Sequence, residues 1–177
     1  MLAYTFWHWP QAATKPGDYE QHMKKFQAAL AAEPPPGFHG GVTMRHEAAP
    51  WLPGEAYLDW YLVDGFADLQ TLNDGAISAS RKAPHDEVAA MAAGGAGGVY
   101  KLRSGPAEPR FARVAHWFHK PAGMRYDELF RHVDGLPGSL WMRQMVLGPS
   151  PEFVLFALAN IALPFPAVRA DLFTVFP

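Results

Sequence analysis

Hydrophobic and polar residues follow two different periods along the first hundred residues. Stretches near 3–9, 40–47 and 56–63 are short and rich in aromatic and β-branched residues, as strands are. Over 18–32 the apolar residues return every three or four positions, which predicts a helix that ends before Pro34. The predicted order is strand 3–9, helix 18–32, strand 40–47, strand 56–63, helical segments 67–73 and 84–93, glycines 94–98 ending the helix, and strand 99–103.

Four sequence blocks occur twice in the same order. Gly37–Arg45 matches Gly135–Arg143, since both have the pattern G-x-x-G-x-x-x-M-R. The other three pairs are Phe6–Pro10 with Trp117–Pro121 (aromatic-aromatic-His-x-Pro), Gly17–Glu20 with Met124–Asp127, and Tyr57–Asp64 with Phe153–Asn160. Blocks repeated in one order indicate an internal duplication.

The second copy is predicted to be shorter than the first. Its helices are predicted at 124–134 and, interrupted by Pro164 and Pro166, near 161–170, and its closing strand at 172–176. We therefore expect residues 1–105 to form the first repeat, 106–110 a linker, and 111–177 an abbreviated second repeat.

The order β-α-β-β-α-β in each copy is that of the ferredoxin-like unit, which carries both helices on one face of its sheet. The other face must also be covered, and two copies in one chain can cover each other sheet to sheet. The predicted class is thus α+β, a single-chain α/β barrel of two ferredoxin-like repeats. Over nearly the whole chain this pattern resembles the dimeric α/β-barrel superfamily. Lys15-Pro16-Gly17 before a helix with Tyr19-Glu20 is similar to its EthD-like and antibiotic-biosynthesis-monooxygenase-like branches.

Composition narrows the classes of function. The 177 residues carry a formal net charge of -2, so no basic excess favours nucleic acid as a partner. Cysteine is absent, which excludes thiolate nucleophiles, iron–sulfur clusters and Cys-type zinc sites. The first residues lack the pattern of a signal peptide, and no apolar run is long enough for a membrane span. We expect a cytoplasmic protein, either a monomer or a homo-oligomer.

Two arginines at matching positions of the repeat are the first candidate site. Strand alternation predicts Val42, Met44, Leu140 and Met142 under the helices, and Thr43, Arg45, Trp141 and Arg143 inside the barrel. A buried guanidinium needs a partner, and Asp59, between Tyr57 and Tyr61, is the candidate. The alternatives are a structural ion pair among the same residues, or arginines exposed at a strand end.

His8 and His119, at matching positions beside large aromatic residues, are the second candidate site. A neutral imidazole can exchange protons near neutral pH or ligate haem iron. Neither histidine has the spacing typical of a metal site, so no metal is predicted. The alternative is that both are amphipathic residues at strand ends.

The glycine-rich stretch 94–98 leads into a strand rather than a helix, which excludes a phosphate-binding loop.

Three hypotheses of function follow. In the first, a cofactor-independent enzyme, monooxygenase- or isomerase-like, acts on a flat, partly anionic aromatic or polyketide-like ligand. Arg45 and Arg143 would orient the ligand, Tyr57, Tyr61 and Trp141 would line the cavity, and His8 or His119 would move a proton. In the second, a histidine is the axial ligand of haem. In the third, a stress-related ligand-binding protein has no catalytic role, and Tyr57, Tyr61, Trp141 and Phe153 close its cavity.

Overall fold

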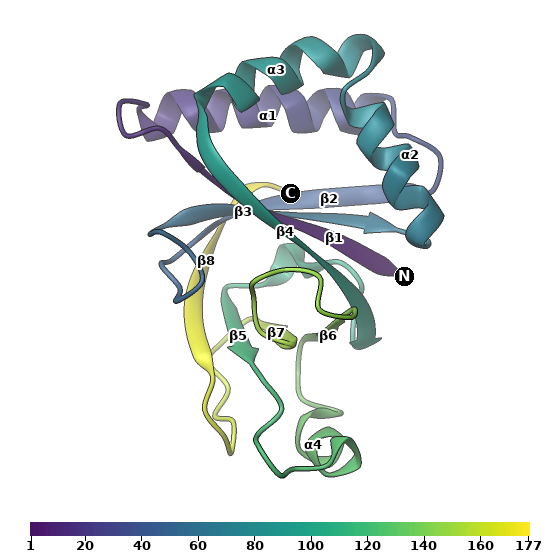
Figure 1. Ribbon diagram of the computed structural model, residues 1–177, viewed down its shortest axis with the longest axis vertical. Helices are drawn as coiled ribbons and strands as arrows, with labels where there is room; N and C mark the ends of the chain where they lie inside the picture. The colour runs from purple at the N-terminus through teal and green to yellow at the C-terminus, as the bar shows by residue number, and fades with distance from the viewer.

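Eight antiparallel strands close into one barrel in the computed structural model, which describes residues 1–177 (Figure 1). The elements in chain order are β1 (Leu2–Pro10), α1 (Pro16–Ala32), β2 (Phe38–His46), β3 (Ala56–Val63), α2 (Phe66–Ala76), α3 (Lys82–Met91), β4 (Ala92–Ser104), β5 (Val114–Phe118), α4 (Tyr126–Val133), β6 (Ser139–Arg143), β7 (Phe153–Ala157) and β8 (Val168–Phe176). Short 3₁₀ turns lie at Ala79–Arg81 and Pro109–Phe111. The predicted α+β class and the barrel are confirmed.

The strand order around the barrel is β1-β3-β2-β8-β5-β7-β6-β4. The strands of the N-terminal half thus lie in the order β4-β1-β3-β2, and those of the C-terminal half in the matching order β8-β5-β7-β6. The edges join through the pairs β2–β8 and β4–β6, so the sheet has no free edge. The division into two duplicated ferredoxin-like domains stays a prediction.

Helices cover the two halves unequally. Figure 1 shows α1, α2 and α3 over the outer face of β1–β4, whereas the short α4 lies at the opposite end of the molecule, below β5–β7. No helix is long and apolar enough to cross a membrane.

Two predicted elements are corrected. The segment 161–170 contains no helix, since prolines 164 and 166 remove the donors a helix needs, and β8 begins at Val168. The glycines of 94–98 do not end α3; they lie inside β4, which begins at Ala92.

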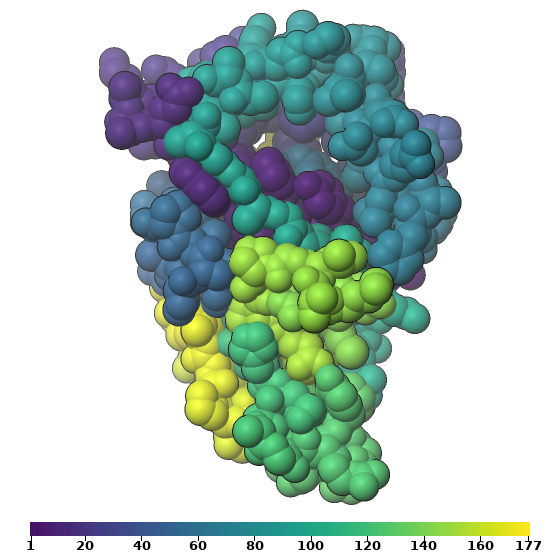
Figure 2. All heavy atoms as spheres, viewed as in Figure 1, coloured from purple at the N-terminus to yellow at the C-terminus, as the bar shows by residue number.

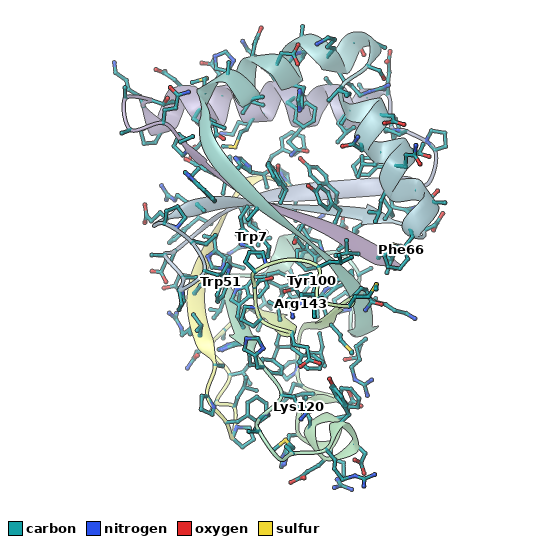
Figure 3. The ribbon with its side chains drawn as sticks, in the orientation of Figure 1. Trp7, Trp51, Phe66, Tyr100, Lys120 and Arg143 are labelled. Atoms are coloured by element: carbon teal, nitrogen blue, oxygen red, sulfur yellow. The ribbon has the colours of Figure 1, made fainter.

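Aromatic side chains fill the barrel interior. Trp7, Trp60, Trp117 and Trp141 are all fully buried. The ring centroids of Trp7 and Trp117 lie 5.4 Å apart, and those of Trp60 and Trp141 5.1 Å apart. Figure 3 shows Trp7, Trp51 and Tyr100 in this region between the two groups of strands. The interior is therefore a packed core, as expected of an eight-stranded barrel.

Strand β2 faces the opposite way from the sequence prediction. Val42 and Met44 belong to the interior core, whereas Thr43 points toward the helices and bonds Asp59. Arg45 lies on the same outer side as Thr43 and is exposed. In β6 the prediction agrees with the structure, because Leu140 and Met142 pack in the apolar cluster beneath α4 and Trp141 lies inside.

The reason is an offset of one residue between the two halves. Met44 pairs with Leu58, and Trp141 pairs with Val154; Leu58 and Val154 both face the interior. Met44 therefore corresponds in space to Trp141, not to Met142 as the repeated motif suggests. The pairing of β2 with β3 is irregular just after Phe38, which shifts the register of β2. A slip of one residue moves every side chain of a strand to the other face.

A buried histidine joins the two halves inside the barrel. His46 Nδ1 donates to the carbonyl oxygen of Glu47 at 2.6 Å, and its Nε2 accepts a hydrogen bond from Trp117 Nε1 at 2.8 Å. A proton on Nε2 would face the indole N–H. Burial lowers the pKa of His46 from 6.5 to about 4, against smaller opposing effects of Glu47.

Acid should therefore destabilise the fold through His46. The pKa of His46 is about 6.5 in the unfolded protein and about 4 in the folded protein. Its contribution to the free energy of unfolding is therefore present above pH 6.5 and is lost as the pH falls toward 4. We expect a loss of about 3 kcal/mol in the free energy of unfolding over this range. Urea unfolding at a series of pH values should show a shallower dependence for His46→Gln than for the wild type. The exposed His39→Gln should keep the wild-type dependence, and an unchanged slope in His46→Gln would contradict the assignment.

Candidate functional site

An apolar cavity lies outside the barrel, between its wall and the helical layer. It has a volume of about 480 Å³ and is bounded by α1, α2 and α3 on one side and by β1, β3 and β4 on the other. Figure 2 shows this hollow opening between β4 and the helices above it. Fifteen of its twenty lining residues are hydrophobic. The polar side chains are those of His8, Gln27, Asp59, Asn73 and His85, with the hydroxyls of Tyr4, Tyr19 and Tyr61.

Aromatic rings of β1 and β3 form the cavity floor on the sheet side. Tyr61, Tyr4, Phe6 and His8 follow one another with ring centroids 6.2, 6.3 and 5.5 Å apart and interplanar angles of 16°, 22° and 19°. They share a face because Tyr4, Phe6 and His8 alternate along β1 with inward-facing residues. We call these four residues the aromatic floor.

Asp59 is a buried carboxylate without a lysine or arginine partner. Its Oδ1 accepts hydrogen bonds from Thr43 Oγ1 at 2.5 Å and Gln27 Nε2 at 3.2 Å, and its Oδ2 accepts one from Tyr61 OH at 2.7 Å. Neutral donors thus replace the water that the charged group loses. The remaining neighbour is His8, whose Nε2 lies 3.3 Å from Oδ2.

His8 connects Asp59 to a helix hydroxyl. Its Nδ1 lies 2.7 Å from the OH of Tyr19 on α1. Its Nε2 is buried and has no aligned hydrogen bond, although Asp59 is near. The nearby carboxylate favours a proton on Nε2, in which case Tyr19 donates to Nδ1. The result is a chain from Tyr19 through His8 to Asp59.

The tyrosines around this chain stay protonated at neutral pH. Burial, followed by the charge of Asp59, raises the pKa of Tyr19, Tyr4 and Tyr61 above its ordinary value. Burial and the carboxylate of Glu20 raise the pKa of Tyr57 to about 12. These hydroxyls therefore act as hydrogen-bond donors rather than as phenolates.

The structure brings together only part of the predicted site. His8, Asp59 and Tyr61 line the cavity, and the Tyr57 ring lies 5.8 Å from that of His8. His119 is exposed, lies in a groove of the other half beside Lys120, and is not among the residues that line the cavity.

Neither predicted arginine pairs with Asp59. Arg45 is exposed, with its guanidinium 5.0 Å from the centre of the Phe173 ring. Arg143 Nη1 donates to the carbonyl oxygens of Gly148 and Ser150, so it fastens the loop between β6 and β7 (Figure 3). Trp141 lies in the packed barrel interior. The predicted ion pair is therefore wrong, because the offset in β2 places Arg45 and Arg143 on different sides of the barrel wall.

Three residues of the candidate site are not predicted from the sequence: Tyr19, Gln27 and Thr43. Gln27 carried a signal, because it is a polar residue on the apolar face of α1, between Phe26 and Leu30, and is only 3% exposed. Thr43 carried no such signal, because its place directly across from Asp59 depends on the register of the β2–β3 pair. No group of three or more metal-ligating side chains is present.

Comparisons with known proteins give one structural likeness. The chain is similar to a crystal structure described, provisionally, as a chlorite dismutase, with 14% identity over 99% of this chain and 96% of that chain, and a TM-score of 0.49. No family model matches the sequence. No curated protein matches it either. The EthD-like or monooxygenase-like branch stays a prediction, and the chemistry of the site rests on its own residues.

The hydrogen bond from Thr43 to Asp59 should contribute more to the free energy of unfolding than an equally buried hydrogen bond between neutral groups. Hydrogen bonds to charged groups contribute about 1.5–3 kcal/mol, against about 1 for neutral ones. Thr43→Val should therefore lower the free energy of unfolding by about 2 kcal/mol. The matched control is Thr5→Val, since Thr5 is equally buried and bonds only the carbonyl oxygen of Gly98. Urea unfolding compares the two, and equal losses would contradict a stronger hydrogen bond from Thr43 to the Asp59 carboxylate.

Proposed function

We propose that the protein binds an uncharged, largely apolar aromatic molecule in the cavity and transfers a proton to or from it without a cofactor. The observation that carries the proposal is the Tyr19–His8–Asp59 chain in the wall of an apolar cavity of about 480 Å³. Apolar pockets of this size with a few convergent polar groups are typical of small-molecule sites.

The charge of the lining supports an uncharged ligand. The twenty lining residues include no lysine or arginine, and Asp59 is in the wall. An anionic ligand would therefore meet a like charge at low local dielectric without a compensating cation. This replaces the partly anionic ligand expected from Arg45 and Arg143.

The chain supplies a route for one proton. As a proton leaves the ligand for the Tyr19 oxygen, the hydroxyl proton of Tyr19 moves to Nδ1 of His8. The imidazolium that results is stabilised by Asp59, 3.3 Å from Nε2. Tyr19 ends as a neutral phenol, as its raised pKa favours. Removal of a proton begins an isomerisation as well as a cofactor-free oxygenation, so it is the step that both predicted reaction classes share.

A general proton-transfer probe tests the proposal. 5-Nitrobenzisoxazole is planar and uncharged, and loss of its C3 proton breaks the N–O bond to give a coloured cyanophenolate. We expect the protein to accelerate this elimination over buffer, and His8→Gln and Tyr19→Phe each to lower the rate at least tenfold, because a positioned base contributes about 10²–10⁴-fold. The exposed His132→Gln on α4 should leave the rate unchanged.

Binding is measured separately by calorimetry with the same probe. Leu69 lines the cavity, so Leu69→Trp should abolish binding, whereas Leu158→Trp, on the exposed surface of the other half, should not. Absence of binding by the wild type would overturn the proposal. Binding without acceleration would overturn its proton-transfer part and favour a non-catalytic ligand-binding protein.

Haem is the second candidate. One observation favours it, since His85 lines the cavity and its Nε2 makes no hydrogen bond within the protein. Two oppose it: no lysine or arginine of the lining can pair with propionates, and both nitrogens of His8 already face partners. The lining therefore does not suit haem.

Titration with haemin decides between the two candidates. We expect no shifted Soret band that depends on a cavity residue, because the lining offers no partner for the propionates. A shifted band at one equivalent that is lost in His85→Ala but kept in His132→Ala would contradict this and establish haem binding.

A further inference from the structure

The glycines of β4 lie directly beneath the aromatic floor. Gly97 pairs with Phe6 and Gly95 with His8, so both belong to the cavity face of β4, as Val99 does. Gly98 belongs to the opposite face, where its nearest neighbours are atoms of Thr5, Leu147 and Tyr100. Neither Gly95 nor Gly97 has a positive φ, so their lack of a side chain is what matters.

Rings of the floor occupy the space that side chains would take. A Cβ on Gly95 would stand 2.5 Å from Cζ of Phe6, and one on Gly97 would stand 3.1 Å from Cε2 and 3.2 Å from OH of Tyr4. The rings of Phe6 and Tyr4 therefore lean across β4 with their tips against its backbone. Any side chain at Gly95 or Gly97 would lift these rings toward the helices and into the cavity.

The floor ends at His8, whose Nε2 lies 3.3 Å from Asp59 Oδ2. His8 is only 4% exposed, and its buried Nε2 lacks an aligned hydrogen bond. Its ring lies 5.5 Å from that of Phe6 at an angle of 19°. A flat molecule placed on the floor therefore meets the Tyr19–His8 pair at one end. Offset stacking on parallel rings rewards planar ligands by about 0.5–1.5 kcal/mol for each ring pair.

We infer that Gly95 and Gly97 are specificity-determining residues, because their lack of side chains lets the rings of the aromatic floor lie against β4. The cavity then selects a planar, uncharged fused-ring molecule that carries a hydroxyl or carbonyl oxygen over a flexible or anionic one. This inference rests on the proposed function, because it concerns the ligand of the same cavity. It also gives the glycine-rich stretch of the sequence a role in ligand selection.

The experiment compares three probes by calorimetry. 2-Naphthol is planar and carries a hydroxyl, 1-decanol has the same number of heavy atoms and a hydroxyl on a flexible chain, and naphthalene-2-sulfonate is planar and anionic. We expect the wild type to bind 2-naphthol at least tenfold more tightly than either of the others. Gly97→Ala should weaken the binding of 2-naphthol at least fivefold and the binding of 1-decanol less than twofold. The flexible chain of 1-decanol can adapt to a raised Tyr4 ring.

Gly98→Ala is the matched control, since its Cβ would be equally crowded, 3.1 Å from Thr5 Oγ1, but on the barrel side of the same strand. It should leave the affinity for both probes unchanged. If Gly97→Ala does not fold, Tyr4→Leu removes a ring of the floor and should weaken 2-naphthol by a similar factor. Equal affinities for 2-naphthol and 1-decanol, or equal effects of Gly97→Ala and Gly98→Ala, would overturn the inference and leave the proposed function standing. Failure of all three probes to bind would overturn the inference, and failure of 5-nitrobenzisoxazole to bind as well would overturn the proposed function.

Discussion

An eight-stranded barrel has an interior just wide enough for side chains, and in this protein four fully buried tryptophans occupy it. Because the ring is closed and its centre is filled, neither the interior nor a strand edge is left for a ligand. The remaining apolar surface is the outer face of the sheet, which helices cover in the N-terminal half and which α4 and the segment before β8 cover in the other. Where that cover does not pack directly onto the sheet, between α1–α3 and β1, β3 and β4, the cavity of about 480 Å³ remains.

The same constraint explains why a carboxylate is tolerated in the cavity wall. Asp59 lies mid-strand, where its backbone is fixed on both sides by pairing with β1 and β2. Its neighbours in the sheet and on α1 can therefore hold donors at fixed positions, and Thr43, Gln27 and Tyr61 do so. Neutral donors at fixed positions thus satisfy a buried carboxylate without a cation, and the proposed proton transfer through His8 depends on this arrangement.

Much of this arrangement could be predicted from the sequence, because it depends on short-range patterns. Alternation places Asp59 on the same face of its strand as Tyr57 and Tyr61, and the structure confirms that grouping. Which of the two faces looked inward could not be predicted, since both carry large aromatic residues. The offset of one residue in β2 reverses the faces of that strand. The repeated motif does not reveal this offset, because its glycines and its Met-Arg pair align in both copies. The sequence therefore predicts that the arginines pair with Asp59, whereas neutral donors do so in the structure.

The two halves differ in whether the space under their helices is filled, and this difference determines which half contains the candidate site. In the strand pair β1–β3, His8 and Asp59 hold the positions that Phe118 and Leu155 hold in the pair β5–β7 of the other half, where both belong to an apolar cluster. In place of α2 and α3 that half has the extended segment before β8, which His116 anchors by accepting a hydrogen bond from the Ile161 N–H at 3.2 Å. Leu163 and Phe165 of this segment pack against the same cluster and occupy the space. The Tyr19–His8–Asp59 chain can act on a ligand only if a cavity lies beside it, and that cavity exists only because helices α2 and α3 cover it. Both conditions are met once, in the N-terminal half.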